Sequence, residues 1–176
     1  MRNDNRLQDA LAHNRGRHIL PVWIDEFQEL TGHAVRSADF LDIHDTKRLK
    51  EAFFERIKAQ TGCCVHEWYA SDFCNVSNLL KRMNELIDSV EVVLFSDVDN
   101  NIGALRVQSS LVLSYADKLK DFLKEDLCFA SEDLINGLCL EFNYYSDAGE
   151  YSPEGFYRLV AWGVFCRAFD KLTKDS

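Results

Sequence analysis

The sequence predicts an α+β fold, in which a helical amino-terminal half precedes a small antiparallel sheet of about four strands. Three observations support this class. Apolar residues recur at helical spacing in several segments of the first half, the spacing changes to that of strands after Ser89, and short polar turns join the later strand-like runs. Helices followed by strands that pair through hairpins are typical of α+β proteins.

The overall composition fits a single domain spanning residues 1–176. The chain has 176 residues, of which 47% are hydrophobic and 12% aromatic, and this is enough to build a core. Two prolines and eight glycines leave little linker sequence. The amino terminus lacks the apolar core of a signal peptide, and no apolar run approaches the roughly 20 residues of a membrane span. We therefore expect a cytoplasmic protein that makes no membrane contact.

Apolar periodicity predicts helices in the first half of the chain. A weak candidate covers Asn3–Asn14, and we expect Arg15–Arg17 to interrupt it. The next helix is expected at Pro21–Gly32, because proline suits a first helical turn and glycine suits the residue after the last one. Stronger one-sided stripes predict helices at Thr46–Gln60 and Val76–Ile87.

Strand patterns dominate from residue 90, with one weaker candidate before it. Cys63–Ala70 alternates poorly and is either a short strand or an irregular segment. Val90–Phe95 and Ile102–Val107 are rich in β-branched and apolar residues, and the polar residues Asp97–Asn101 between them predict a hairpin turn. Ser109–Lys124 returns to helical spacing.

The last third of the chain predicts two more strands and a final helix. The strands are Leu127–Ala130 and Leu138–Tyr145, and alternation in the second is expected to turn Glu141 outward. Ser146–Tyr151 is expected to be a loop. Phe156–Leu172 is apolar on almost every side, so we expect it to be a central, buried helix.

Negative charge is concentrated between Asp117 and Glu154. The chain has a formal net charge of −9, and this stretch holds ten acidic residues and three basic ones. Tyr144, Tyr145 and Tyr151 lie in the same stretch. An acidic and aromatic surface suits a basic protein partner, because complementary fields speed association and suppress wrong partners. The chain lacks the clustered Lys and Arg of a phosphate-binding surface, so we expect no direct contact with nucleic acid.

Cysteine and histidine residues offer an alternative site. Cys63, Cys64, His66 and Cys74 could supply soft ligands to zinc, so this region could serve a metal-dependent or thiol-dependent enzyme. Their spacing matches no standard pair of zinc knuckles, and adjacent cysteines rarely both reach one tetrahedral ion. We interpret the six cysteines of the chain as buried thiols of a reducing compartment.

No other motif predicts catalysis. The sequence contains neither G-x-S-x-G nor a glycine-rich phosphate loop. Asp97–Gly103 imitates the start of a calcium loop, but its glycine comes one place late and Gln108 stands where the loop needs glutamate. We therefore predict a non-catalytic protein that uses no cofactor and holds no metal.

One passage resembles a known family. Leu138–Tyr145 reads LCLEFNYY, and Tyr151–Gly163 reads YSPEGFYRLVAWG. In this passage the chain resembles bacterial immunity proteins of contact-dependent inhibition, which neutralise a toxin delivered by a neighbouring cell. The resemblance implies a small acidic inhibitor whose partner is a basic protein, often a toxin nuclease domain. Phage-encoded inhibitors of bacterial defence systems share these traits and are the alternative.

The predicted binding site combines charge with aromatic anchors. Carboxylates would stand where a nuclease holds phosphates, and tyrosines would be buried against the partner. This prediction assumes that folding gathers the acidic side chains on one rigid face. If the chain is instead a subunit of a larger complex, its apolar final helix is expected to be partly exposed. The predicted partner-binding residues are Glu132, Asp133, Glu141, Tyr144, Tyr145, Asp147, Glu150, Tyr151 and Glu154.

Overall fold

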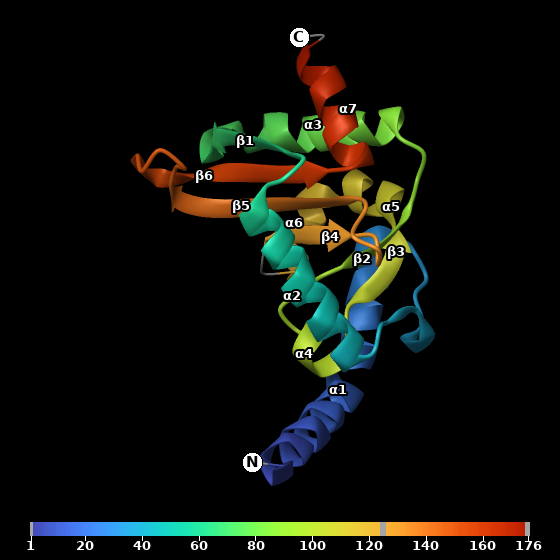
Figure 1. The fold of residues 1–176 in the computed structure, drawn as a ribbon. Coiled ribbons are helices and arrows are strands. Elements are labelled where there is room, and N and C mark those ends of the chain that lie inside the picture. Colours follow the sequence, from blue (N-terminus) through green and yellow to red (C-terminus); the bar gives the residue numbers. More distant parts are fainter. Residues whose placement is uncertain (1, 124–125, 175–176) are drawn as a thin grey trace.

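A computed structural model describes residues 2–123 and 126–174, with side chains from Asn14 onward except that of Phe73. These residues form seven α-helices, two short 3-10 helices and one six-stranded sheet (Figure 1). The helices are α1 (Arg2–Thr31), α2 (Ile43–Ala59), α3 (Phe73–Leu86), α4 (Asp99–Ile102), α5 (Ser109–Ser114), α6 (Ala116–Leu123) and α7 (Val164–Lys174). The 3-10 helices are η1 (Ser37–Asp39) and η2 (Ala70–Asp72). The strands are β1 (Cys63–Tyr69), β2 (Glu91–Leu94), β3 (Leu105–Gln108), β4 (Leu127–Ala130), β5 (Gly137–Tyr145) and β6 (Tyr151–Trp162).

The sheet has the strand order β1-β6-β5-β4-β2-β3, and every neighbouring pair is antiparallel. The α+β class and the helical amino-terminal half are therefore confirmed. The expected number of strands, about four, is too low. Two further strands, β1 and β6, pair with each other and extend the four predicted strands at the β5 edge.

The main error concerns β6, which the sequence predicts as the first half of a long helix at Phe156–Leu172. Its apolar residues point alternately to two buried faces: Leu159 belongs to one hydrophobic cluster, while Val160 and Trp162 belong to the other. A strand buried on both faces reads as a continuous apolar run, and periodicity alone cannot distinguish it from a buried helix. The chain turns at Gly163, which has a φ of +65°, and only then begins α7.

The predicted break at Arg15–Arg17 is also wrong, because α1 is continuous from Arg2 to Thr31. Gly16 serves a different purpose. A Cβ atom at this position would lie 2.2 Å from the carbonyl oxygen of Asn101 in α4. The glycine therefore allows the two helices to approach closely and does not end the first one.

Helices cover the two faces of the sheet unequally. Helices α1, α3, α5, α6 and α7 contribute to the larger cluster, which includes Phe27, Leu80 and Phe165. Helix α2 packs on the opposite face, where Phe53 and Trp162 belong to a smaller cluster. In Figure 1 this helix crosses in front of the sheet. In this view α2 does not extend over the end of the hairpin that joins β5 to β6.

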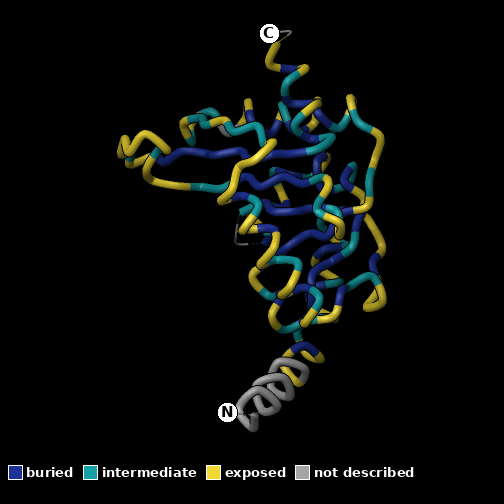
Figure 2. The backbone as a smooth tube through the Cα atoms, viewed as in Figure 1, coloured by how far each residue is buried: buried dark blue, intermediate teal, exposed yellow. Residues whose placement is uncertain are grey.

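This hairpin projects from the body of the protein. Strands β5 and β6 have 9 and 12 residues, whereas β4 has only four. The end of the β5–β6 pair therefore extends past β4 (Figure 1). Figure 2 shows that both strands are buried where they cross the body and exposed toward this end.

Gly137 tests the packing between β5 and β6. It lies opposite Trp162, and an added Cβ would be 2.2 Å from an atom of the fully buried indole ring. We expect Gly137→Ala to lower the free energy of unfolding by about 1–3 kcal/mol, since overpacking a rigid core forces shifts. Urea denaturation followed by circular dichroism measures this loss.

The matched background is Trp162→Phe, which removes the indole atoms that the new methyl group would meet. In that background Gly137→Ala should lower the free energy of unfolding by less than it does in the natural chain. Equal losses in the two backgrounds would show that the close contact does not limit the stability of the fold.

Candidate protein-binding site

Eight of the nine predicted binding residues form two separate groups, not one continuous face, and the ninth, Glu141, lies between them in the middle of β5. Glu132 and Asp133 lie in the connection between β4 and β5, whereas the group from Tyr144 to Glu154 begins with the last two residues of β5 and continues through the loop into β6. Strand β5 has nine residues. At about 3.3 Å per residue it separates the two groups by roughly 25–30 Å. The assumption that the acidic side chains gather on one face is therefore wrong.

The carboxylates of the β4–β5 connection make contacts within the chain. Glu132 forms an ion pair with Arg106 of β3. Asp133 accepts hydrogen bonds from the Ser131 hydroxyl at 2.6 Å and from the Ile135 backbone N–H at 3.0 Å. These two bonds lower the pKa of Asp133. Both residues thus stabilise the local structure, and we do not assign them to a binding surface.

An ion-pair cluster centred on a buried arginine lies between the body and the hairpin end, and we call Arg158, Glu141 and Asp147 the Arg158 cluster. Arg158 of β6 is 8% exposed, and it donates to Glu141 at 2.9 Å and to Asp147 at 3.0 Å. Burial lowers the pKa of Arg158, but the hydrogen bonds and charges of these two carboxylates outweigh that effect and raise it overall. The backbone N–H of Asp147 also donates to Glu67 of β1 at 2.9 Å. These contacts therefore fix the loop after β5 to β6, through Arg158, and to β1, through Glu67.

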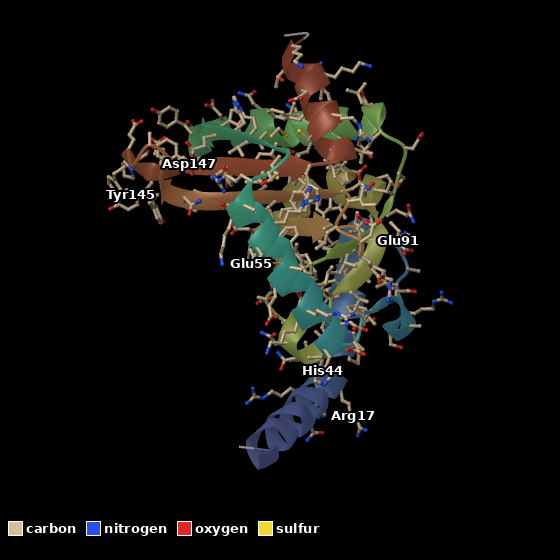
Figure 3. All side chains as sticks on the ribbon, in the orientation of Figure 1. Arg17, His44, Glu55, Glu91, Tyr145 and Asp147 are labelled. Carbon is tan, nitrogen blue, oxygen red and sulfur yellow. The ribbon has the colours of Figure 1, made fainter. Side chains whose placement is uncertain are left out.

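Beyond this cluster lies a group of exposed tyrosines at the hairpin end. Tyr144, Tyr145 and Tyr151 are 54%, 63% and 59% exposed. The rings of Tyr145 and Tyr151 contact each other across the strand pair, with centroids 5.3 Å apart. Figure 3 labels Tyr145 at the projecting end, near Asp147. A register shift between Asn143 and Tyr145 places Tyr145 opposite Tyr151.

Tyr69 joins this group, although the sequence did not identify it. It ends β1, is 47% exposed, and packs against Phe156 with ring centroids 5.0 Å apart. Its hydroxyl donates to Glu150 at 3.2 Å, and the negative charge of Glu150 and this bond raise the pKa of Tyr69. The spacing of Glu67 and Tyr69 on β1 is the one signal that could have indicated an acidic and aromatic edge.

We call this surface the hairpin tip. It presents rings and carboxylates on a backbone that β-sheet hydrogen bonds and the Arg158 cluster hold in place. Among the predicted residues, Glu141 lies in the Arg158 cluster below the tip, Asp147 belongs to both the cluster and the tip, and Glu154 is exposed at the tip on β6. The hairpin tip comprises Tyr69, Tyr144, Tyr145, Asp147, Glu150, Tyr151 and Glu154.

The sequence cluster of cysteines and histidine does not come together. Cys63 and Cys64 are successive residues of β1, so they pack against opposite faces of the sheet. Cys74 is exposed, which contradicts the prediction that all the cysteines are buried; Cys128 and Cys139 are buried as expected. Cys64 instead lies beside Cys166 of α7. Burial, a hydrogen bond with Cys166 and the charges of Cys166 and Asp170 raise the pKa of Cys64.

The segment that imitates a calcium loop has a structural role. Asp99, at the start of α4, is 1% exposed and accepts hydrogen bonds from the backbone N–H and the hydroxyl of Ser96 at 2.9 and 2.7 Å. Lys50 of α2 lies 3.5 Å from the same carboxylate. Burial raises the pKa of Asp99, and these partners offset part of that rise. The carboxylate therefore joins α2 to α4.

No protein-family model matches the chain, and neither a curated protein nor a solved structure is significantly similar to it. Within residues 2–123 and 126–174, no helix has the length and apolarity needed to cross a membrane. The hairpin tip is thus defined by its own geometry, as a projecting, exposed and aromatic surface bordered by carboxylates.

Arg158 provides a test of how rigidly the tip is held. We expect Arg158→Leu to lower the free energy of unfolding by about 2–3 kcal/mol, because it leaves the largely buried carboxylate of Glu141 without its partner. Arg106→Leu is the matched control, since its partner Glu132 is half exposed. That change should cost less than about 1 kcal/mol. Chemical denaturation of both variants measures the difference, and equal losses would contradict the proposed support.

Proposed function

We propose that the chain is a non-catalytic inhibitor that neutralises a basic protein partner through its hairpin tip. One observation supports this proposal most strongly. Exposed tyrosines and carboxylates lie together on a hairpin end that the Arg158 cluster holds in place. A rigid surface loses little conformational entropy on binding, so more of its contact energy contributes to affinity.

The chemistry of the tip suits a partner with a cationic groove. Tyrosine is enriched at the centres of protein interfaces, because a flat ring buries much area and its hydroxyl can still form a hydrogen bond. Glu150 and Glu154 border the rings and are exposed. Such charges increase the association rate with a basic surface and discourage acidic partners.

A toxin nuclease is the partner class that we favour. A nuclease binds phosphates with clustered cationic side chains, and carboxylates on a projecting hairpin could occupy that place. The net charge of −9 also attracts a positively charged partner. The resemblance of Leu138–Tyr145 and Tyr151–Gly163 to bacterial immunity proteins agrees with this partner, and both passages belong to the hairpin that carries the tip.

We expect a gene beside that of this chain to encode a basic nuclease, and the direct test uses that enzyme. An equimolar amount of the purified chain should abolish cleavage of nucleic acid by that enzyme, and co-expression should restore growth to cells that produce it. A neighbouring gene that encodes no basic nuclease, or cleavage that continues in the presence of excess chain, would overturn the proposed function.

Variants of the tip test the proposed surface separately. Tyr145→Ala and Tyr151→Ala should each weaken binding to that nuclease by roughly 10–100-fold, as expected for central aromatic anchors. Glu132→Lys is the matched control, because this exposed residue lies at the other end of β5, and it should leave the affinity within about threefold of the natural chain. Inhibition that survives both tyrosine changes would reject the tip while leaving the function intact.

The salt dependence of binding distinguishes electrostatic steering by the carboxylates from anchoring by the tyrosines. The double variant Glu150→Lys and Glu154→Lys should slow association with the nuclease, and the difference from the natural chain should diminish as salt is raised from about 0.05 to 0.5 M, because screening shortens the range of the field. Surface plasmon resonance measures both rates. A difference that does not depend on salt would contradict electrostatic steering.

A further inference from the structure

We propose that Cys64, Cys166 and Asp170 bind a zinc ion between the edge strand β1 and helix α7. This inference is independent of the proposed inhibitor function. The two Sγ atoms and a carboxylate oxygen lie within 4.8 Å of one another, and all three residues are half-buried. An ion can therefore reach the site from solvent.

Local structure explains why these three residues meet. Cys166 and Asp170 are four residues apart on α7, so they project from the same side of the helix. Cys64 lies on the face of β1 that packs toward the cluster containing Phe165 and Phe169 of α7. Strand β1 pairs with β6, and β6 leads through Gly163 directly into α7. The sheet and this short connection thus fix the strand relative to the helix.

The distances require only a small adjustment. Zinc binds thiolate sulfur at about 2.3 Å and carboxylate oxygen at about 2.0–2.2 Å, so ligand atoms in a tetrahedral site are roughly 3.5 Å apart. Ligand atoms no more than 4.8 Å apart can reach this arrangement by modest side-chain rotation. Three protein ligands would leave a fourth position for water.

The donor set selects the class of ion. Thiolates are soft ligands that favour zinc over magnesium or calcium, which prefer oxygen alone. The ion would replace the proton on each of the two thiols, and both protons would pass to solvent. Its double positive charge would then offset two of the three negative charges of the two thiolates and the carboxylate. Bound zinc would tie the carboxy-terminal helix to the edge of the sheet.

Cobalt titration of the reduced, untagged chain tests the site. One equivalent of Co²⁺ should produce the thiolate-to-cobalt charge-transfer band and the visible bands of tetrahedral cobalt, and Zn²⁺ should abolish them. Cys64→Ser and Cys166→Ser should each remove the charge-transfer signal at one equivalent, and Asp170→Asn should weaken binding at least tenfold. The matched controls are Cys63→Ser, which changes the adjacent thiol on the opposite face of β1, and Cys74→Ser; both should bind cobalt like the natural chain.

A second measurement needs no variant. Zn²⁺ should protect Cys64 and Cys166 from alkylation by iodoacetamide, while Cys63 and Cys74 react at unchanged rates, as followed by peptide mass spectrometry. The proposal is overturned if the natural chain shows no saturable binding, if Cys63→Ser abolishes binding while Cys166→Ser retains it, or if zinc leaves the alkylation of Cys64 and Cys166 unchanged.

Discussion

The structure depends on the pairing of β6 with both β1 and β5. This strand is buried from Gly155 to Trp162, and its alternate residues fill the hydrophobic clusters on the two faces of the sheet. Its pairing with β5 builds the long hairpin that carries the tip. Its pairing with β1 brings Tyr69 to that tip and Cys64 to the opposite end, beside α7. Both candidate sites therefore depend on the pairing of one interior strand, β6.

The acidic stretch of the sequence has several roles in the folded chain. Glu132 pairs with a cation of the body, and Glu141 and Asp147 surround Arg158. The charges of these three carboxylates therefore contribute more to the stability of the fold than to the electrostatic field outside it. At the tip the exposed carboxylate of Glu150 remains beside the tyrosines, with the Tyr69 hydroxyl as its partner. The surface proposed for binding is thus smaller and more aromatic than a count of acidic residues implies.

One-sided apolar patterns allowed α2 and α3 to be predicted, because each of them buries a single stripe. Strand β5 was also predicted, from its alternating residues, although its first part is buried on both faces. The pattern of β6 is ambiguous, since burial on both sides removes the periodicity that distinguishes strand from helix. The contacts of Tyr69 with Glu150 and of Cys64 with Cys166 join residues 81 and 102 positions apart in the sequence. Neither contact can be inferred from local spacing, because both arise from the pairing of β1 with β6.

Binding through the hairpin tip requires that the β5–β6 hairpin is a rigid, preformed surface in the free chain. Amide hydrogen exchange, resolved by residue, measures this most directly. If the hairpin is rigid, the amides of residues 156–162 exchange slowest, and residues 143, 145 and 151, which pair toward the tip, are also protected, because the ladder and the Arg158 cluster extend order in that direction. Exchange of the hairpin end at the rates of an unstructured peptide, with protection confined to the body, would contradict it.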